Sequence, residues 1–321
     1  MMTMSSIGGR RRGPVSFRAL CLAALLLALV ALPGAGRADD AQQTMFASPE
    51  EAAKALVDAA AKGDTDALVA IFGPDGQDLV TSGDAVADKN ARDSFVASTK
   101  QAMRLEKVGD DKVILNIGRD DWPLPIPIVK GAAGWYFDTA EGHEEIINRR
   151  IGRNELGAID VARAYVAAQR EYASLVRDGS GLAKFAQKIA SSPDKKDGLY
   201  WPAVEGADLS PFGPLIAGAV AEGYSTKQTG TPTPYHGYFF KILKAQGKSA
   251  PGGAYDYVIN GNMIAGFALV AYPADYGSSG VMTFIVNQQG VVYQKDLGEQ
   301  TAEIAGAMTR NDPHATWQKD E

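Results

Sequence analysis

The residues with the clearest chemical potential surround His236. This imidazole lies between Tyr235 and Tyr238, and Trp201 and Tyr255 are in neighbouring segments of the chain. Because an imidazole titrates near neutral pH, a histidine among tyrosines can hold a ligand or transfer a proton. The sequence predicts these five side chains as ligand-binding residues. A hydrogen-bonded histidine at an aromatic sheet edge is the alternative interpretation.

Other chemical motifs are missing from the sequence. His143 and His314 are far apart, and His143 lacks the second histidine four residues on that a zinc-protease helix requires. We find neither a Gly-x-Ser-x-Gly elbow nor a phosphate-binding loop with its lysine. The aspartate pairs at 110–111 and 120–121 do not have the spacing of a calcium-binding loop. We therefore predict no catalytic residue, no metal ligand and no cofactor, which favours a binding role over catalysis.

The N-terminal segment has the pattern of a secretory signal peptide. Arginines at positions 10–12 and 18 precede an apolar run, Ala19–Leu32, and small residues follow at 36 and 38. The run is shorter than the roughly 20 residues that span a bilayer. We predict cleavage after Ala38, with membrane contact only during export. The expected location is the periplasm, and an extracellular location is the alternative.

Composition narrows the class of protein further. The chain has 321 residues, 45 % of them hydrophobic, and a formal net charge of −6, which argues against a general nucleic-acid binder. Its single cysteine, Cys21, lies in the predicted signal peptide. Disulfides and thiolate chemistry are therefore not expected in the mature chain. A protein or cell-envelope partner is compatible with this composition.

A long amphipathic helix is predicted over residues 142–176, because Ile147, Ile151, Ile159 and Val166 recur at helical spacing. Glycines at 152 and 157 each cost about 1 kcal/mol inside a helix and predict a bend or break. The helix divides the chain into a predicted signal peptide, an N-terminal domain, a linking helix and a C-terminal domain. Their boundaries are 1–38, 39–141, 142–180 and 181–321.

The N-terminal domain is predicted to combine helices with an antiparallel sheet. A capping box at Ser48 begins one helix, and two more are expected at 64–72 and 88–103. Strands are expected at 113–117, 122–129 and 135–137. This order is typical of an α+β fold. It resembles, in architecture only, the cone-like group of nuclear transport factor two and ketosteroid isomerase.

The C-terminal domain is predicted to be an antiparallel sheet packed on the long helix. The expected helices and strands follow from periodicity and turn residues. Helices are expected at 182–190, 210–223 and 301–308, and strands at 238–243, 264–272, 281–287 and 291–295. A long helix followed by a four-strand meander resembles the topology of pilins and pseudopilins. The predicted fold class is therefore α+β throughout.

Three passages carry a resemblance to one known family. They are RRIGRNE at 149–155, PYHGYFF at 234–240, and AYPADYG at 271–277 continuing into VVYQKDLG at 291–298. Together they resemble the bacterial domain-of-unknown-function 2950 family, whose members are exported. The resemblance spans about Phe46 to Trp317 and implies no activity, substrate or cofactor.

The leading functional hypothesis is a non-catalytic periplasmic binding or assembly module. Tyrosines concentrate in the C-terminal half, and tyrosine suits surfaces where an apolar side meets a wet one. The alternative is a periplasmic small-molecule-binding protein or enzyme, with a pocket in the N-terminal domain or near His236.

Overall fold

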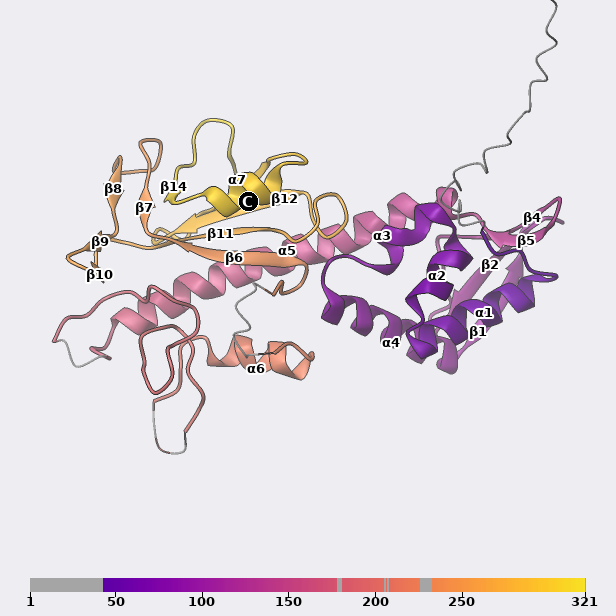
Figure 1. Cartoon of the computed structure of the whole chain (residues 1–321), viewed down its shortest axis with the longest axis horizontal. Coiled ribbons are helices and arrows are strands. Elements are labelled where there is room, and N and C mark those ends of the chain that lie inside the picture. The colour runs from indigo at the N-terminus through magenta and orange to yellow at the C-terminus, as the bar shows by residue number, and fades with distance from the viewer. Residues whose placement is uncertain (1–42, 178–180, 205, 207, 226–232, 321) are drawn as a thin grey trace, which may run out of the picture. The chain divides into compact units, whose positions relative to one another are not determined.

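The chain folds into helices and mainly antiparallel sheets, so the predicted α+β class is confirmed (Figure 1). The computed structural model describes residues 43–177, 181–204, 206, 208–225 and 233–320. The predicted signal peptide and its cleavage position lie outside the described residues. Within those residues, no helix has the length and apolarity needed to cross a membrane.

Short capped helices begin the described chain. The Ser48 side chain accepts a hydrogen bond from the Glu51 amide at 3.2 Å, and Gly63 ends the first helix at φ 66°, where glycine is favoured. The capping prediction at Ser48 is therefore confirmed. The last helix of the group begins at Ala85 rather than Asp88, because Asp84 caps it. The elements are α1 (Pro49–Lys62), α2 (Thr65–Phe72), η1 (Pro74–Gly76), α3 (Gln77–Val80) and α4 (Ala85–Gln101).

The first sheet is antiparallel, with strand order β1-β2-β4-β5 and β3 paired to β2. Met103 was predicted as the end of a helix, but it begins the first strand. The strand predicted at 122–129 is split in two, because its alternating prolines have no N–H to donate to a ladder. The strands are β1 (Met103–Lys107), β2 (Lys112–Ile117), β3 (Trp122–Pro123), β4 (Ile128–Gly131) and β5 (Gly134–Phe137).

The long helix, α5 (Thr139–Ala173), has 35 residues and continues through Gly152 and Gly157. The predicted break is therefore wrong. Gly142 has a packing role, because a Cβ there would lie 2.4 Å from the Pro125 carbonyl oxygen. At Gly157 a Cβ would lie 3.1 Å from His236 Nδ1, so both positions let another segment approach the helix closely.

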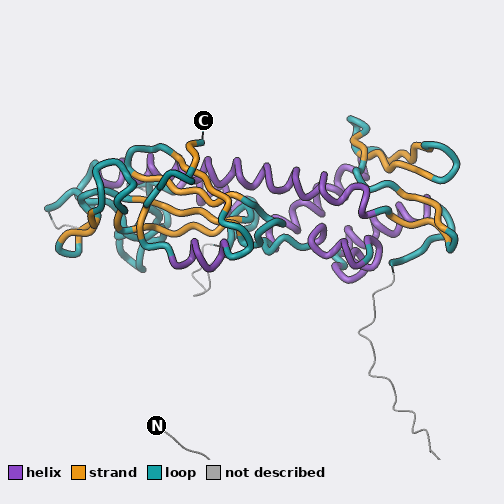
Figure 2. The backbone as a smooth tube through the Cα atoms, turned by 90° about the horizontal axis from the view of Figure 1, so that it is seen from above, coloured by secondary structure: helices purple, strands orange, loops and turns teal. Residues whose placement is uncertain are grey.

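The second large sheet packs against α5 (Figure 2). Its strand order is β15-β13-β12-β11-β6. The predicted four-strand meander and the final helix are confirmed, and β15 adds an edge strand. The strands of the sheet are β6 (Tyr238–Leu243), β11 (Ala268–Pro273), β12 (Met282–Asn287), β13 (Val292–Asp296) and β15 (Gln318–Lys319). Helix α7 (Thr301–Ala307) contacts β11, and α6 (Gly213–Ala221) contributes Leu215 and Ile216 to the same hydrophobic core. Short pairings complete the structure: β7 (Ala245–Gln246) with β8 (Tyr255–Asp256) and β14 (Arg310–Asn311), and β9 (Val258–Ile259) with β10 (Asn262–Met263).

The helix predicted at 182–190 is absent from the described part of that segment. Instead, the buried Gln169 side chain bonds both the amide and the carbonyl of Ala186, each at 2.8 Å. The Phe185 amide bonds the Met263 carbonyl in an isolated bridge. These tertiary bonds satisfy the backbone in an extended form, and they outweigh a weak amphipathic pattern.

Two hydrophobic cores lie within the compact unit Asp40–Glu321. The first joins α1 and α2 to the first sheet, around residues such as Leu115 and Phe137. The second joins the C-terminal half of α5 to the second sheet, and it includes Tyr165 and Tyr238. Since α5 links the two, side chains near its N-terminal half can meet groups from both parts of the chain.

Candidate functional site

An open pocket of about 570 Å³ lies where η1 and α3 meet the first turns of α5. Its walls combine carboxylates, neutral polar groups and one histidine. The lining residues are Pro74, Asp75, Gln77, Asp78, Thr81, Ala140, His143, Glu144 and Asp275. A pocket with convergent polar groups is the usual starting point for a binding-site hypothesis.

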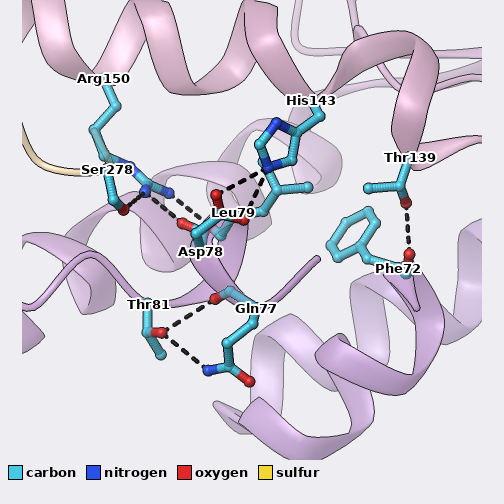
Figure 3. Close-up of polar contacts among 9 residues, drawn as sticks. All are labelled: Phe72, Gln77, Asp78, Leu79, Thr81, Thr139, His143, Arg150 and Ser278. Atoms are coloured by element: carbon cyan, nitrogen blue, oxygen red, sulfur yellow. Dashed lines mark hydrogen bonds and ion pairs between the residues drawn. The ribbon is translucent and has the colours of Figure 1, made fainter. Parts of the chain in front are cut away.

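His143 and Asp78 form the best-defined contact of this pocket (Figure 3). The Nε2 atom of His143 lies 2.9 Å from both carboxylate oxygens of Asp78. The two side chains are 28 % and 40 % exposed, so they are accessible from solvent. The carboxylate fixes the ring orientation, and a protonated ring would form an ion pair with it.

Arg150 holds the α3 turn that carries Asp78. Its guanidinium donates to the Asp78 carbonyl at 2.5 Å, to the Leu79 carbonyl at 2.6 Å and to Ser278 Oγ at 3.3 Å (Figure 3). These bonds satisfy carbonyls at the end of a helical turn. Burial lowers the pKa of Arg150 from its ordinary value, and the nearby Asp88 and Asp78 oppose that change. An arginine nonetheless stays charged in proteins, so the turn is held by a cation.

Three more hydrogen bonds fix the backbone at the base of the pocket. Gln77 Nε2 donates to Thr81 Oγ1 at 3.1 Å, and that hydroxyl donates to the Gln77 carbonyl at 3.1 Å (Figure 3). Thr139 at the start of α5 donates to the Phe72 carbonyl at 2.6 Å. The pocket is therefore built on ordered backbone rather than on a loose loop.

Carboxylates outnumber cationic side chains among the lining residues of the pocket, and the Arg150 guanidinium interacts electrostatically with two of them, Asp78 and Asp275. Asp75, Glu144 and Asp275 are exposed, and within the described residues none of these three side chains has a hydrogen bond or an ion pair. Like charges gathered in one concavity raise the local concentration of cations. The described residues contain no group of three or more histidine, cysteine, aspartate or glutamate side chains able to hold a metal ion.

A second polar cluster is organised by the buried carboxylate of Asp84, which is 1 % exposed. One oxygen accepts from the amides of Val86 and Ala87 at 3.2 and 3.0 Å, which caps α4. The other accepts from the Tyr224 hydroxyl at 2.8 Å and the Gly237 amide at 2.9 Å. Burial raises the pKa of the Tyr224 phenol, so it remains a donor at neutral pH.

His236, the centre of the predicted site, borders this second cluster. Its Nε2 lies 2.6 Å from Glu222 Oε2, and its ring lies 4.1 Å from the ring of Tyr235. Its Nδ1 faces the backbone of α5 at Gly157, and its own φ is 49°. Glu222 therefore holds one ring nitrogen, and Tyr235 packs against the ring.

The structure brings only Tyr235 and His236 of the five predicted residues into ring contact within the described chain. Tyr238 is fully buried, and its hydroxyl donates to the Met282 carbonyl at 2.9 Å. Tyr255 accepts from Gln288 Nε2 at 3.2 Å. The ring of Trp201 has cations over it, with Arg177 at 5.5 Å and Lys196 at 5.4 Å. These geometries do not test ligand binding, which stays a prediction for the five residues.

The pocket residues were missed by sequence reasoning for a clear reason. His143 and Asp78 are 65 residues apart, and no spacing rule relates them. Arg150 is 72 residues from Asp78, although it lies in the first passage of the family resemblance. That passage was the available signal, because the three passages meet in space. A Cβ at Gly237 would lie 2.5 Å from Asn154 Nδ2, and the Gly237 carbonyl accepts from the Ala274 amide at 2.9 Å.

Fold and site together define an α+β protein with an open, carboxylate-rich pocket supported by its long helix. The family comparison agrees with the sequence resemblance: the model of the domain-of-unknown-function 2950 family, described as a protein of unknown function, matches residues 43–319. The chain therefore belongs to this family. No curated protein and no solved structure matches the chain.

Proposed function

We propose that this protein is an exported, non-catalytic binding protein that holds a small cationic ligand in the pocket around Asp78. The observation that carries the proposal is the set of carboxylates facing one pocket, three of them without a hydrogen bond or ion pair in the described residues. An ammonium or guanidinium group would offset the repulsion between these carboxylates, and it can donate hydrogen bonds to several of them at once. An anionic ligand would meet the same repulsion and be excluded.

The pocket dimensions support a small molecule. Its volume of about 570 Å³ falls within the range of roughly 300–1,000 Å³ that is common for small-ligand sites. Its openness suits a polar ligand that keeps part of its hydration shell. We infer reversible binding of a modest-sized amine rather than enclosure of an apolar cofactor.

The tyrosine-rich assembly surface receives less support than this pocket. Tyr238 and Tyr257 are fully buried, and their rings belong to the second core. The other tyrosines of the sheet, such as Tyr272 and Tyr293, pack against the same core. A docking surface made of these rings would require them to face solvent.

Export is proposed on the sequence alone, from the apolar run at 19–32 and the small residues that follow it. A periplasmic site would give the pocket direct access to small cations of the cell envelope. Mass spectrometry of the mature protein from its own host would test this, with Asp39 as the expected first residue. An intact N-terminus on protein in the cytoplasm would contradict export.

The binding proposal is tested by calorimetric titration of the purified protein with butane-1,4-diamine and with acetate. We expect heat of binding with the diamine only. Asp78→Asn should weaken binding of the diamine by about fivefold or more, since it removes one charge-assisted contact. The matched control is Asp160→Asn, which removes the same charge from a residue 80 % exposed on α5. Equal affinity in the Asp78 variant, or no binding to the unaltered protein, would refute the proposal.

A second candidate, an acid–base enzyme, is favoured by the His143 and Asp78 contact. Asp78 engages Nε2, and Nδ1 has no hydrogen bond within the described residues. An imidazole oriented in this way can accept a proton from a bound substrate. The distinguishing result is conversion of a bound ligand that His143→Gln abolishes while affinity is kept. A ligand released unchanged by the unaltered protein would favour the binding function.

A further inference from the structure

The first sheet has one edge strand that no other segment covers. Within the described residues, β1 pairs with β2 alone, whereas the opposite edge at β5 is bridged by Phe46, whose amide donates to the Trp135 carbonyl at 2.8 Å. Four of the five residues of β1 are exposed, and the central one, Leu105, is half-buried against the first core. An open edge of this kind is a template for pairing with a further strand.

The hydrogen bonds to β2 decide which backbone groups of β1 face outward. The Val108 amide donates to the Lys112 carbonyl at 2.8 Å, just beyond the end of β1. Since bonded positions alternate along an antiparallel pair, positions 104 and 106 bond β2 as well. The residues whose amides and carbonyls point away from β2 are Met103, Leu105 and Lys107. These outward groups have no hydrogen-bond partner in the part of the chain that the structure describes.

The sequence of β1, MRLEK, is complementary to itself in the antiparallel direction. A second copy centred on Leu105 places the two Leu105 residues opposite each other, position 103 opposite 107, and Arg104 opposite Glu106. All the outward amides and carbonyls of both copies are then paired, and the two-fold axis produces the Arg104–Glu106 contact twice. Opposite charges directly across two strands stabilise their pairing, and like charges weaken it.

The side chains needed for this contact are already oriented. Arg104 Nη1 lies 3.1 Å from Glu106 Oε2, and Asn116 donates to the same oxygen at 3.0 Å. The Arg104 and Glu106 side chains are 50 % and 49 % exposed, so a second strand can reach both. Leu105 points to the other face of the sheet, because alternate residues of a strand point to opposite faces. Two copies therefore gain an apolar contact on that face as well.

We propose that β1 is a dimerisation edge, at which two copies of this chain join their first sheets by antiparallel β1–β1 pairing. Charges on an edge strand commonly prevent such pairing, but the order of charges in β1 attracts an antiparallel copy. A parallel copy in register would place Arg104 opposite Arg104 and is disfavoured. The contact is small, so the dimer forms reversibly as the protein concentration rises. The inference is independent of the pocket, which has no lining residue in β1.

Sedimentation velocity over a range of protein concentrations measures the dimer affinity. Glu106→Arg should weaken dimerisation by about tenfold or more, because it places two like-charged pairs across the strands, and Arg104→Glu should act in the same way. The double variant Arg104→Glu with Glu106→Arg restores opposite charges and should return the affinity to within about threefold of the unaltered protein. Asp160→Arg is the matched control, because it changes the net charge as Glu106→Arg does, at a side chain 80 % exposed on α5. It should change the affinity by less than about twofold.

Hydrogen exchange locates the contact on the chain. The amides at 103, 105 and 107 should exchange more slowly as the protein concentration rises. Lys107→Pro removes an outward donor but no bond to β2, so it should weaken dimerisation and keep the circular dichroism spectrum. A protein that is monomeric at every concentration would overturn the inference. The same conclusion would follow from a dimer that the charge reversals weaken no more than Asp160→Arg does, or one that the double variant fails to restore.

Discussion

Replacing Asp84 should destabilise the protein more than replacing an ordinary helix-capping residue would. Its carboxylate accepts four hydrogen bonds at 1 % exposure, two from the start of α4 and two from Tyr224 and Gly237. Asp84→Ala removes the cap, which costs about 1 kcal/mol. It also leaves the Tyr224 hydroxyl and the Gly237 amide without an acceptor, at about 1–3 kcal/mol each. The expected loss is therefore roughly 3–7 kcal/mol in the free energy of unfolding.

The chain provides a matched comparison in Asp64. It caps α2 through one bond, to the Ala67 amide at 3.0 Å, and that bond is exposed. Asp64→Ala should therefore cost about 1 kcal/mol. Urea unfolding of both variants, followed by circular dichroism and by tryptophan fluorescence, measures the difference directly.

A milder substitution guards against a variant that does not fold, since a domain has only about 5–15 kcal/mol of stability. Asp84→Asn keeps an oxygen for the α4 amides and places an amide group against the Gly237 N–H. We expect an intermediate loss of about 2 kcal/mol. If Asp84→Ala and Asp64→Ala lost equal stability, the Asp84 bonds to Tyr224 and Gly237 would contribute nothing, and the reasoning would be wrong.

Two further predictions concern stability. Gly152→Ala should stabilise the protein by up to about 1 kcal/mol, because a Cβ there meets open space. Gly157→Ala should leave the stability unchanged or lower it, because its Cβ would press on His236. Thermal unfolding of the two variants measures the difference, and equal gains in stability would contradict this prediction. Burial opposes ionisation of Asp197, but hydrogen bonds from Lys188 and Ser192 lower its pKa from 3.8 to about 2. A lowered pKa stabilises the folded state above pH 4, and this contribution is lost as the pH falls towards 2. After solvent screening it should be at most about 1 kcal/mol, so Asp197→Asn should be less stable than the unaltered protein at pH 7 and equal to it near pH 2 in urea unfolding. A constant difference across that range would contradict the assignment.

The elements that the sequence predicted well are those with strong local signals. The spacing of apolar residues predicted α5 to within a few residues, and turn residues predicted the strands of the second sheet. β1 was missed because the segment is short and mostly exposed, so its alternation carries little hydrophobic signal. The predicted helix at 182–190 failed because the contacts of Gln169 and Phe185 are made with distant residues.

The pocket could not be predicted from the sequence, because its residues also come together only through contacts between distant parts of the chain. A site assembled from η1, α3, α5 and the turn after β11 depends on how the chain folds back on itself. The sequence drew attention to His236 through its aromatic neighbours, but neighbours in sequence are not required to line a cavity. His143 has no such neighbours, and its partner Asp78 lies 65 residues away.

The length of α5 has a consequence for how the protein gains its structure. A 35-residue helix extends roughly 50 Å, and its two ends belong to different hydrophobic cores. A fragment that ends before residue 139 would lack the contacts of Thr139 and His143. A fragment that begins at residue 139 would expose the N-terminal turns of α5, because their partners Phe72 and Asp78 would be missing. Neither half of the chain therefore keeps all the contacts that it makes in the whole protein. The two cores should therefore melt in a single cooperative transition, and separation of the halves by cutting the chain should yield aggregation instead of two independent modules.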